Sequence, residues 1–194
     1  MPRDESEASL VAHAIQRDAE AFSQLYNLYF DRVYRYARLK VGNAADAEDV
    51  AAAVFLSAWR TIDRFSPKHE LSFAGWLFRL AHNVLVDRYR RMRETVSLDS
   101  VGHESLGMET FPSPEAELEW RLTLAEVHDA LLTLTEEQRE VVLLRFVEGL
   151  SAREVGDIMG KHEGTVRGMQ FRAIEALRRA LSYAYAKERH AHER

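Results

Sequence analysis

The chain has 194 residues, a formal net charge of −5 and no cysteine. Without cysteine, disulfides, thiol nucleophiles and thiolate metal sites are excluded, and a reducing cytoplasm is the expected compartment. Hydrophobic residues make up 46% and charged residues 29%, a balance that argues against both intrinsic disorder and a membrane protein. The amino terminus is charged, and no stretch approaches the roughly 18 apolar residues of a membrane span, so neither export nor membrane contact is expected.

Apolar residues recur at helical spacing nearly everywhere, and no segment shows the sustained alternation of a strand, so an all-α fold is expected. The first predicted helix starts at Asp18 and is closed by Gly42 in the manner of a carboxy-terminal cap. A second helix follows and is stopped by the turn residues 66–68. A third runs over about 72–93, with arginines towards its end, where cations suit the helix dipole.

Between residues 94 and 114 the helical periodicity fails, and serine, glycine and proline accumulate. Ser113 followed by Pro114 suits an N-cap with proline at the first helical position, so a new helical domain is expected to begin there. The sequence therefore predicts two small helical domains joined by a flexible linker. Their expected limits are 8–95 for the first domain, 96–113 for the linker, 114–184 for the second domain and 185–194 for a tail.

Two capping boxes predict helix starts in the second half, after Thr135 and after Ser151. The helix after Ser151 can run only to about Met159, because a glycine follows, and a further helix is expected to start near 162–163. A short capped helix, a glycine turn and a second helix together form the plan of a helix-turn-helix.

Three apolar residues, Val155, Ile158 and Val166, can close the small core of this motif. The second helix offers basic and polar side chains near its start, where a recognition helix touches base edges and phosphates. An ordinary helical hairpin with a solvated basic face is the alternative. The coincidence of turn, caps and basic residues favours DNA binding.

Basic residues gather in two segments, 79–93 and 161–179, although the net charge is acidic. Acidic residues such as Asp46, Glu48 and Asp49 lie in other segments. Different faces are therefore expected to meet partners of different charge, so that one protein binds both DNA and another protein.

At this point a family resemblance becomes specific. Residues 130–167, through LTEEQREVVLLR, EGLSAREVGDIM and GTVR, resemble the promoter-reading domain of extracytoplasmic-function (ECF) sigma factors of the sigma-70 family. The first half resembles the other domain of that family, through DAEDV, FLSAWR and FAGWLFRLAHNVLVDRYRR. The resemblance implies a non-enzyme that binds core RNA polymerase, engages the minus-35 and minus-10 elements of promoter DNA and helps to melt it. It also implies an anti-sigma factor as a regulatory partner.

The resemblance assigns residues to three sites. The polymerase-binding residues are Asp46, Asp49, Val50, Phe55 and Trp59. The minus-10 residues are Lys68, Trp76, Arg79, Asn83, Arg88 and Arg91. The minus-35 residues, which the helix-turn-helix pattern also indicates, are Lys161, His162, Glu163, Thr165, Arg167, Met169 and Arg172. Phe55, Trp59 and Trp76 suit the core as well, and Ala52 and Ala53 replace a Gln-Glu pair that is usual in the family.

Two other functions fit parts of the sequence. A conventional repressor or activator would bind operator DNA alone, usually as a symmetric dimer, but the linker and the unlike first domain argue against it. The last-ranked alternative is that the first domain is a protein-interaction module that sequesters a regulator, with DNA binding as a secondary function. No cofactor or metal is expected, because 156–162 lacks the spacing of a phosphate loop and His190 and His192 lack further ligands. No residue pattern indicates catalysis.

Overall fold

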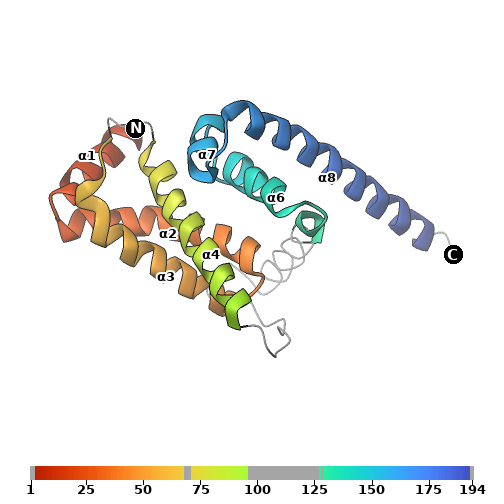
Figure 1. Cartoon of the computed structure of the whole chain (residues 1–194), viewed down its shortest axis with the longest axis horizontal. Helices are drawn as coiled ribbons and strands as arrows, with labels where there is room; N and C mark the ends of the chain where they lie inside the picture. The colour runs from red at the N-terminus through yellow and green to blue at the C-terminus, as the bar shows by residue number, and fades with distance from the viewer. Residues whose placement is uncertain (1–2, 68–70, 96–126, 128, 193–194) are drawn as a thin grey trace. The chain divides into compact units, whose positions relative to one another are not determined.

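The computed structural model describes residues 3–67, 71–95, 127 and 129–192. Their regular structure is helical and includes no strand, which confirms the predicted all-α fold. The chain divides into two compact units, Met1–Ser105 and Leu106–Arg194 (Figure 1). The predicted linker and the helix start at Pro114 lie outside the described residues. Within the described ranges, no helix is long and apolar enough to cross a membrane.

The described residues of the first unit form the helices that Figure 1 labels α1 to α4. They are α1 (Arg3–Ile15), α2 (Ala19–Val41), α3 (Ala44–Thr61) and α4 (Phe73–Thr95), with a short 3₁₀ turn at Ile62–Arg64. The sequence pattern predicts α2, α3 and α4 within a few residues of these limits. Helix α1 is an addition, and it packs against α2 and the 3₁₀ turn.

Local caps explain where these helices begin and end. The Asp18 side chain accepts hydrogen bonds from the backbone N–H groups of Glu20 and Ala21 and so caps α2. Gly42 ends α2 in the left-handed region, with φ 83°. Asn43 then caps α3, because its Oδ1 accepts from the Asp46 N–H at 2.8 Å.

Large apolar side chains from three helices form the core of this unit. Tyr36 of α2 meets Phe78 of α4 edge to face, with ring centroids 5.4 Å apart. Both rings are fully buried, together with Val54 of α3 and Leu77 and Leu85 of α4. This core fixes which faces of α3 and α4 remain outside.

Arg17, in the connection between α1 and α2, fastens the end of α3. Its guanidinium donates to the Trp59 carbonyl and, at 3.2 Å, to the Arg60 carbonyl, and it pairs with Asp63 at 2.9 Å. The Arg17 hydrogen bond holds the pKa of the Asp63 carboxyl below its ordinary value. The stability from this pair is therefore present above the ordinary carboxyl pKa and is lost as the pH falls through the lowered value.

The backbone of Arg17 lies in the left-handed region, at φ 67°, which disfavours a side chain. Arg17→Ala should lower the free energy of unfolding by about 1–2 kcal/mol, because the contacts to α3 are lost and the strain remains. Arg17→Gly should lower it less, because glycine relieves the strain. Urea denaturation in a Trp120→Phe background, followed by the fluorescence of Trp59 and Trp76, measures both. Equal losses for the two variants would contradict the presence of strain at this position.

The second unit contains α6 (Glu136–Val142), a π-helical turn (Leu143–Val147), α7 (Ala152–Met159) and α8 (Glu163–His192). Both predicted capping boxes are present, at Thr135 with Gln138 and at Ser151 with Glu154. The residues expected to close the helix-turn-helix core are buried: Val155, Ile158 and Val166. The predicted motif is confirmed.

Two glycines shape the turn between α7 and α8. Gly160 ends α7 with φ +64°, and the next N–H, that of Lys161, donates to the Gly156 carbonyl at 2.8 Å. A Cβ on Gly156 would lie 2.5 Å from the Lys161 carbonyl oxygen, so the turn approaches α7 closely there. The tight turn therefore depends on both positions lacking a side chain.

The same substitution should have opposite effects at two glycines of this unit. Gly160→Ala should destabilise the unit by about 1 kcal/mol, because its backbone is left-handed. Gly168→Ala should stabilise it by up to about 1 kcal/mol, because Gly168 lies inside α8 and an added Cβ meets nothing within 4 Å. Hydrogen exchange of the α7 and α8 amides should be faster in the first variant and slower in the second. Changes in the same direction would contradict the different backbone roles of the two glycines.

Candidate functional site

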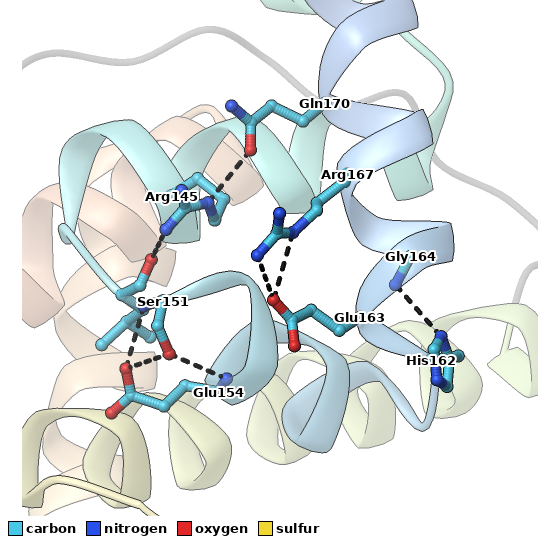
Figure 2. Close-up of polar contacts among 9 residues, drawn as sticks. Arg145, Ser151, Glu154, His162, Glu163, Gly164, Arg167 and Gln170 are labelled. Carbon is cyan, nitrogen blue, oxygen red and sulfur yellow. Dashed lines mark hydrogen bonds and ion pairs between the residues drawn. The ribbon is translucent and has the colours of Figure 1, made fainter.

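The start of α8 is held by His162, one of the predicted minus-35 residues (Figure 2). Its Nδ1 accepts a hydrogen bond from the Gly164 N–H at 3.1 Å, and its carbonyl accepts from the Thr165 and Val166 N–H groups. His162 therefore acts as the N-cap of the predicted recognition helix. Its ring is exposed beside the first turn, where the helix dipole favours an anion.

Two ion pairs involve the predicted DNA contacts of this unit. Arg167 donates to Glu163 Oε1 from Nε at 3.1 Å and from Nη2 at 2.5 Å, as Figure 2 shows. Lys161 Nζ lies 2.7 Å from Glu137 Oε1 of α6. Arg167 nevertheless keeps 71% of its side chain exposed, so its pair is an accessible surface pair. These ion pairs orient the side chains of Lys161 and Arg167 but do not bury them.

Exposure separates the remaining predicted minus-35 residues. Thr165 and Arg172 are exposed, as a DNA contact requires. Met169 is only 8% exposed and belongs to the core with Val166, so its burial does not favour a direct contact with DNA. Phe171, 68% exposed, lies on the outer side of α8 one turn after Arg167. The spacing of four residues from Arg167 would have indicated it.

The hydrogen bonds of a partly buried arginine hold α8 against the rest of the motif. Arg145, in the π-helical turn, donates from Nε to Gln170 Oε1 at 3.0 Å and from Nη1 to the Leu150 carbonyl (Figure 2). Leu150 directly precedes Ser151, the N-cap of α7. One guanidinium therefore joins the π-helical turn, the start of α7 and the recognition helix.

In the first unit, α4 presents three of the predicted minus-10 residues on one face. Trp76, Arg79 and Asn83 are spaced by three and four residues, and the same spacing continues to Val86 and Arg90. Asn83, Val86 and Arg90 are exposed, and Val86 is 49% exposed. Trp76 is half-buried against the rings of Phe65 and Phe73. Val86 is the residue that sequence reasoning missed on this face, although the spacing indicates it.

Arg88 does not share that face. Its guanidinium pairs with Asp46 at the start of α3, and the two side chains are 28% and 29% exposed. The other Asp46 oxygen accepts from Asn43 Nδ2 at 2.8 Å. Arg91 is exposed and donates from Nε to the Asp87 carbonyl at 3.3 Å. Lys68 lies outside the described residues.

Four of the predicted polymerase-binding residues of α3 differ in how far they are exposed. Asp49 is exposed on the first half of the helix, where it offers a carboxylate to a partner. Val50 and Phe55 are buried, at 2% and 6%, so they support this surface from inside. Trp59 is half-buried, with its ring 4.9 Å from that of Phe22 and with Arg17 over it at 5.6 Å.

The chemistry of these faces suits recognition of nucleic acid and protein. Exposed guanidinium and amide groups bind phosphates and base edges, and aromatic planes bind unstacked bases. Among the described side chains, no group of three or more His, Cys, Asp or Glu residues is arranged to hold a metal ion.

Comparison with known protein families finds two matches in this chain. Residues 25–95 match the family model described as Sigma-70 region 2. Residues 124–177 match the model described as Sigma-70, region 4. The first match runs from within α2 to the end of α4, and the second includes α7, the glycine turn and the first half of α8.

Individual proteins give the same relationship. The ECF RNA polymerase sigma factor BldN of Streptomyces coelicolor is 37% identical over 89% of this chain, which spans 64% of BldN. The ECF RNA polymerase sigma factor SigW of Bacillus subtilis is 30% identical over 84% of this chain and 90% of SigW. A solved structure of the sigma factor RpoE with the anti-sigma factor NepR, from Bartonella quintana, superposes with a TM-score of 0.67. That match has 25% identity and covers 84% of this chain and 98% of RpoE. The chain belongs to the ECF sigma factors of the sigma-70 family.

Proposed function

We propose that this protein binds core RNA polymerase and directs promoter-specific initiation of transcription. In this proposal, the start of α3 contacts the polymerase, with Asp49 as its most accessible carboxylate. The outward face of α4 captures the minus-10 element and helps to melt it. The start of α8 reads the minus-35 element in the major groove. The polymerase supplies the catalysis, and the protein itself is not an enzyme.

The observation that carries the proposal is the presence of both promoter-binding regions in one chain. Sigma-70 region 2 and region 4 match in order, and each coincides with a compact helical unit. A conventional repressor is not favoured, because it would require a helix-turn-helix without a polymerase-binding domain. The first unit differs from the helix-turn-helix unit because it matches region 2, the other domain of these factors.

Regulation by a protein partner follows from the same family. RpoE of Bartonella quintana was solved with an anti-sigma factor, and we infer a partner of this class for the present chain. Such a partner would cover the polymerase-binding and DNA-binding faces. Because the bacterial polymerase acts in the cytoplasm, we place the protein there as well.

The minus-35 assignment is tested by run-off transcription with core polymerase on a promoter library. Wild-type protein should give specific transcripts that core polymerase alone does not give. Arg167→Ala combined with Arg172→Ala should lower their yield about a hundredfold, because each lost arginine contact to bases or phosphates removes about 1–3 kcal/mol.

A second pair of arginines on the same helix gives the control. Arg178 and Arg179 are exposed but lie further along α8, beyond its first turns. Arg178→Ala combined with Arg179→Ala should retain most of the transcription. Equal losses for both double variants would indicate that only the overall charge matters. Tight binding of palindromic duplex DNA without polymerase binding would instead support a repressor.

The polymerase-binding face is tested by the affinity of the full chain for core polymerase. Asp49→Ala should weaken binding about tenfold, because an exposed carboxylate that pairs with a basic partner group is lost. Glu48→Ala removes the same charge from the neighbouring exposed position and should have a smaller effect. Fluorescence anisotropy with labelled protein measures both. Equal losses for the two variants would contradict the assignment of Asp49.

A further inference from the structure

Two residues with different predicted partners are bound to each other in the first unit. Asp46 is predicted to contact the polymerase, and Arg88 is predicted to contact minus-10 DNA. In the structure, Arg88 Nη2 pairs with Asp46 Oδ1. A polymerase cation at Asp46 and a DNA phosphate at Arg88 would each compete with this ion pair.

Asp46 is the fixed member of the pair. Its Oδ2 accepts from Asn43 Nδ2 at 2.8 Å, and its own N–H donates to Asn43 Oδ1 at 2.8 Å. The carboxylate therefore keeps its place at the start of α3 even without Arg88. Arg88 has a long side chain that is 28% exposed, so it is able to turn towards solvent once the carboxylate is occupied.

The ion pair also holds Arg88 away from the predicted DNA face. Arg79, Asn83 and Arg90 share the outward side of α4, whereas Arg88 is held against α3. A carboxylate beside a guanidinium neutralises its charge and repels a phosphate. Arg88 is therefore a poor phosphate ligand while the pair is intact.

We propose that the Asp46–Arg88 ion pair is an autoinhibitory contact, which keeps Arg88 from single-stranded DNA until a basic side chain of the polymerase engages Asp46. That the basic partner of Asp46 belongs to the polymerase rests on the proposed function. Because the pair is partly exposed, its strength is modest, and a competing cation can open it. By linkage, polymerase binding then favours DNA binding, and DNA binding favours polymerase binding to the same extent.

Asp46→Asn should mimic the engaged state. The asparagine can still accept from Asn43, but it no longer neutralises Arg88. The full-length variant should bind fluorescein-labelled oligothymidylate about fivefold more tightly than wild type, as expected if Arg88 is available in only about a tenth of the wild-type molecules and its contact strengthens binding about tenfold. Fluorescence anisotropy at constant ionic strength measures the affinity.

Glu48→Gln is the matched control. It raises the net charge by the same unit, two residues further along α3, at an exposed position. It should change the affinity by less than about twofold, since only long-range attraction is altered. Asp46→Asn that binds no more tightly than Glu48→Gln would overturn the proposal.

Arg88→Gln tests the other member of the pair. In the Asp46→Asn background it should abolish the gain, whereas in otherwise wild-type protein it should lower the affinity only about twofold, because Arg88 is masked in most molecules. A loss of about fivefold or more in otherwise wild-type protein would overturn the proposal, even if Asp46→Asn fails to fold. Circular dichroism verifies folding of each variant.

The affinity of the wild-type protein for core polymerase is measured in parallel. Absence of that binding would contradict the proposed function. The oligothymidylate results do not depend on it, so failure of the ion-pair proposal and failure of the proposed function are told apart.

Discussion

The first unit depends on the packing of three helices around Tyr36 and Phe78. These rings meet edge to face in the fully buried core, and Val54 of α3 is buried with them. Once that contact is made, the orientation of each helix about its own axis is set, because only one apolar side can face inward. The acidic start of α3 and the polar face of α4 then lie outside. The surfaces assigned to polymerase and DNA are consequences of one core.

Helix limits were predictable because their causes are local. Asp18, Gly42, Thr135 and Ser151 act on backbone groups within a few residues, so each signal can be identified in the sequence. The contacts of Arg17 with the end of α3 were not predictable. They join residues 42 and 43 positions apart and exist only after the helices have packed. For the same reason, the pairing of Asp46 with Arg88 and of Arg145 with Gln170 was not predictable from the sequence.

The candidate site was predictable as a region and less so residue by residue. The capped helices and the glycine turn located the recognition helix correctly. Met169 was included among the DNA contacts, although its spacing of three from Val166 and four from Ala173 follows the buried side of α8. The acidic net charge also gave little guidance. Lys161 and Arg167 are paired with glutamates inside the chain, so DNA binding at these predicted contacts would exchange ion pairs rather than add free cations.

The connection between α2 and α3 consists of only two residues, Gly42 and Asn43. A left-handed glycine followed by a capping asparagine reverses the chain at once, so α2 and α3 form a helical hairpin from neighbouring sequence. Contacts between near neighbours require little loop closure and form early in folding. We expect this hairpin to assemble before α4 docks, so that the acidic surface of α3 exists on the nascent chain before α4 is in place.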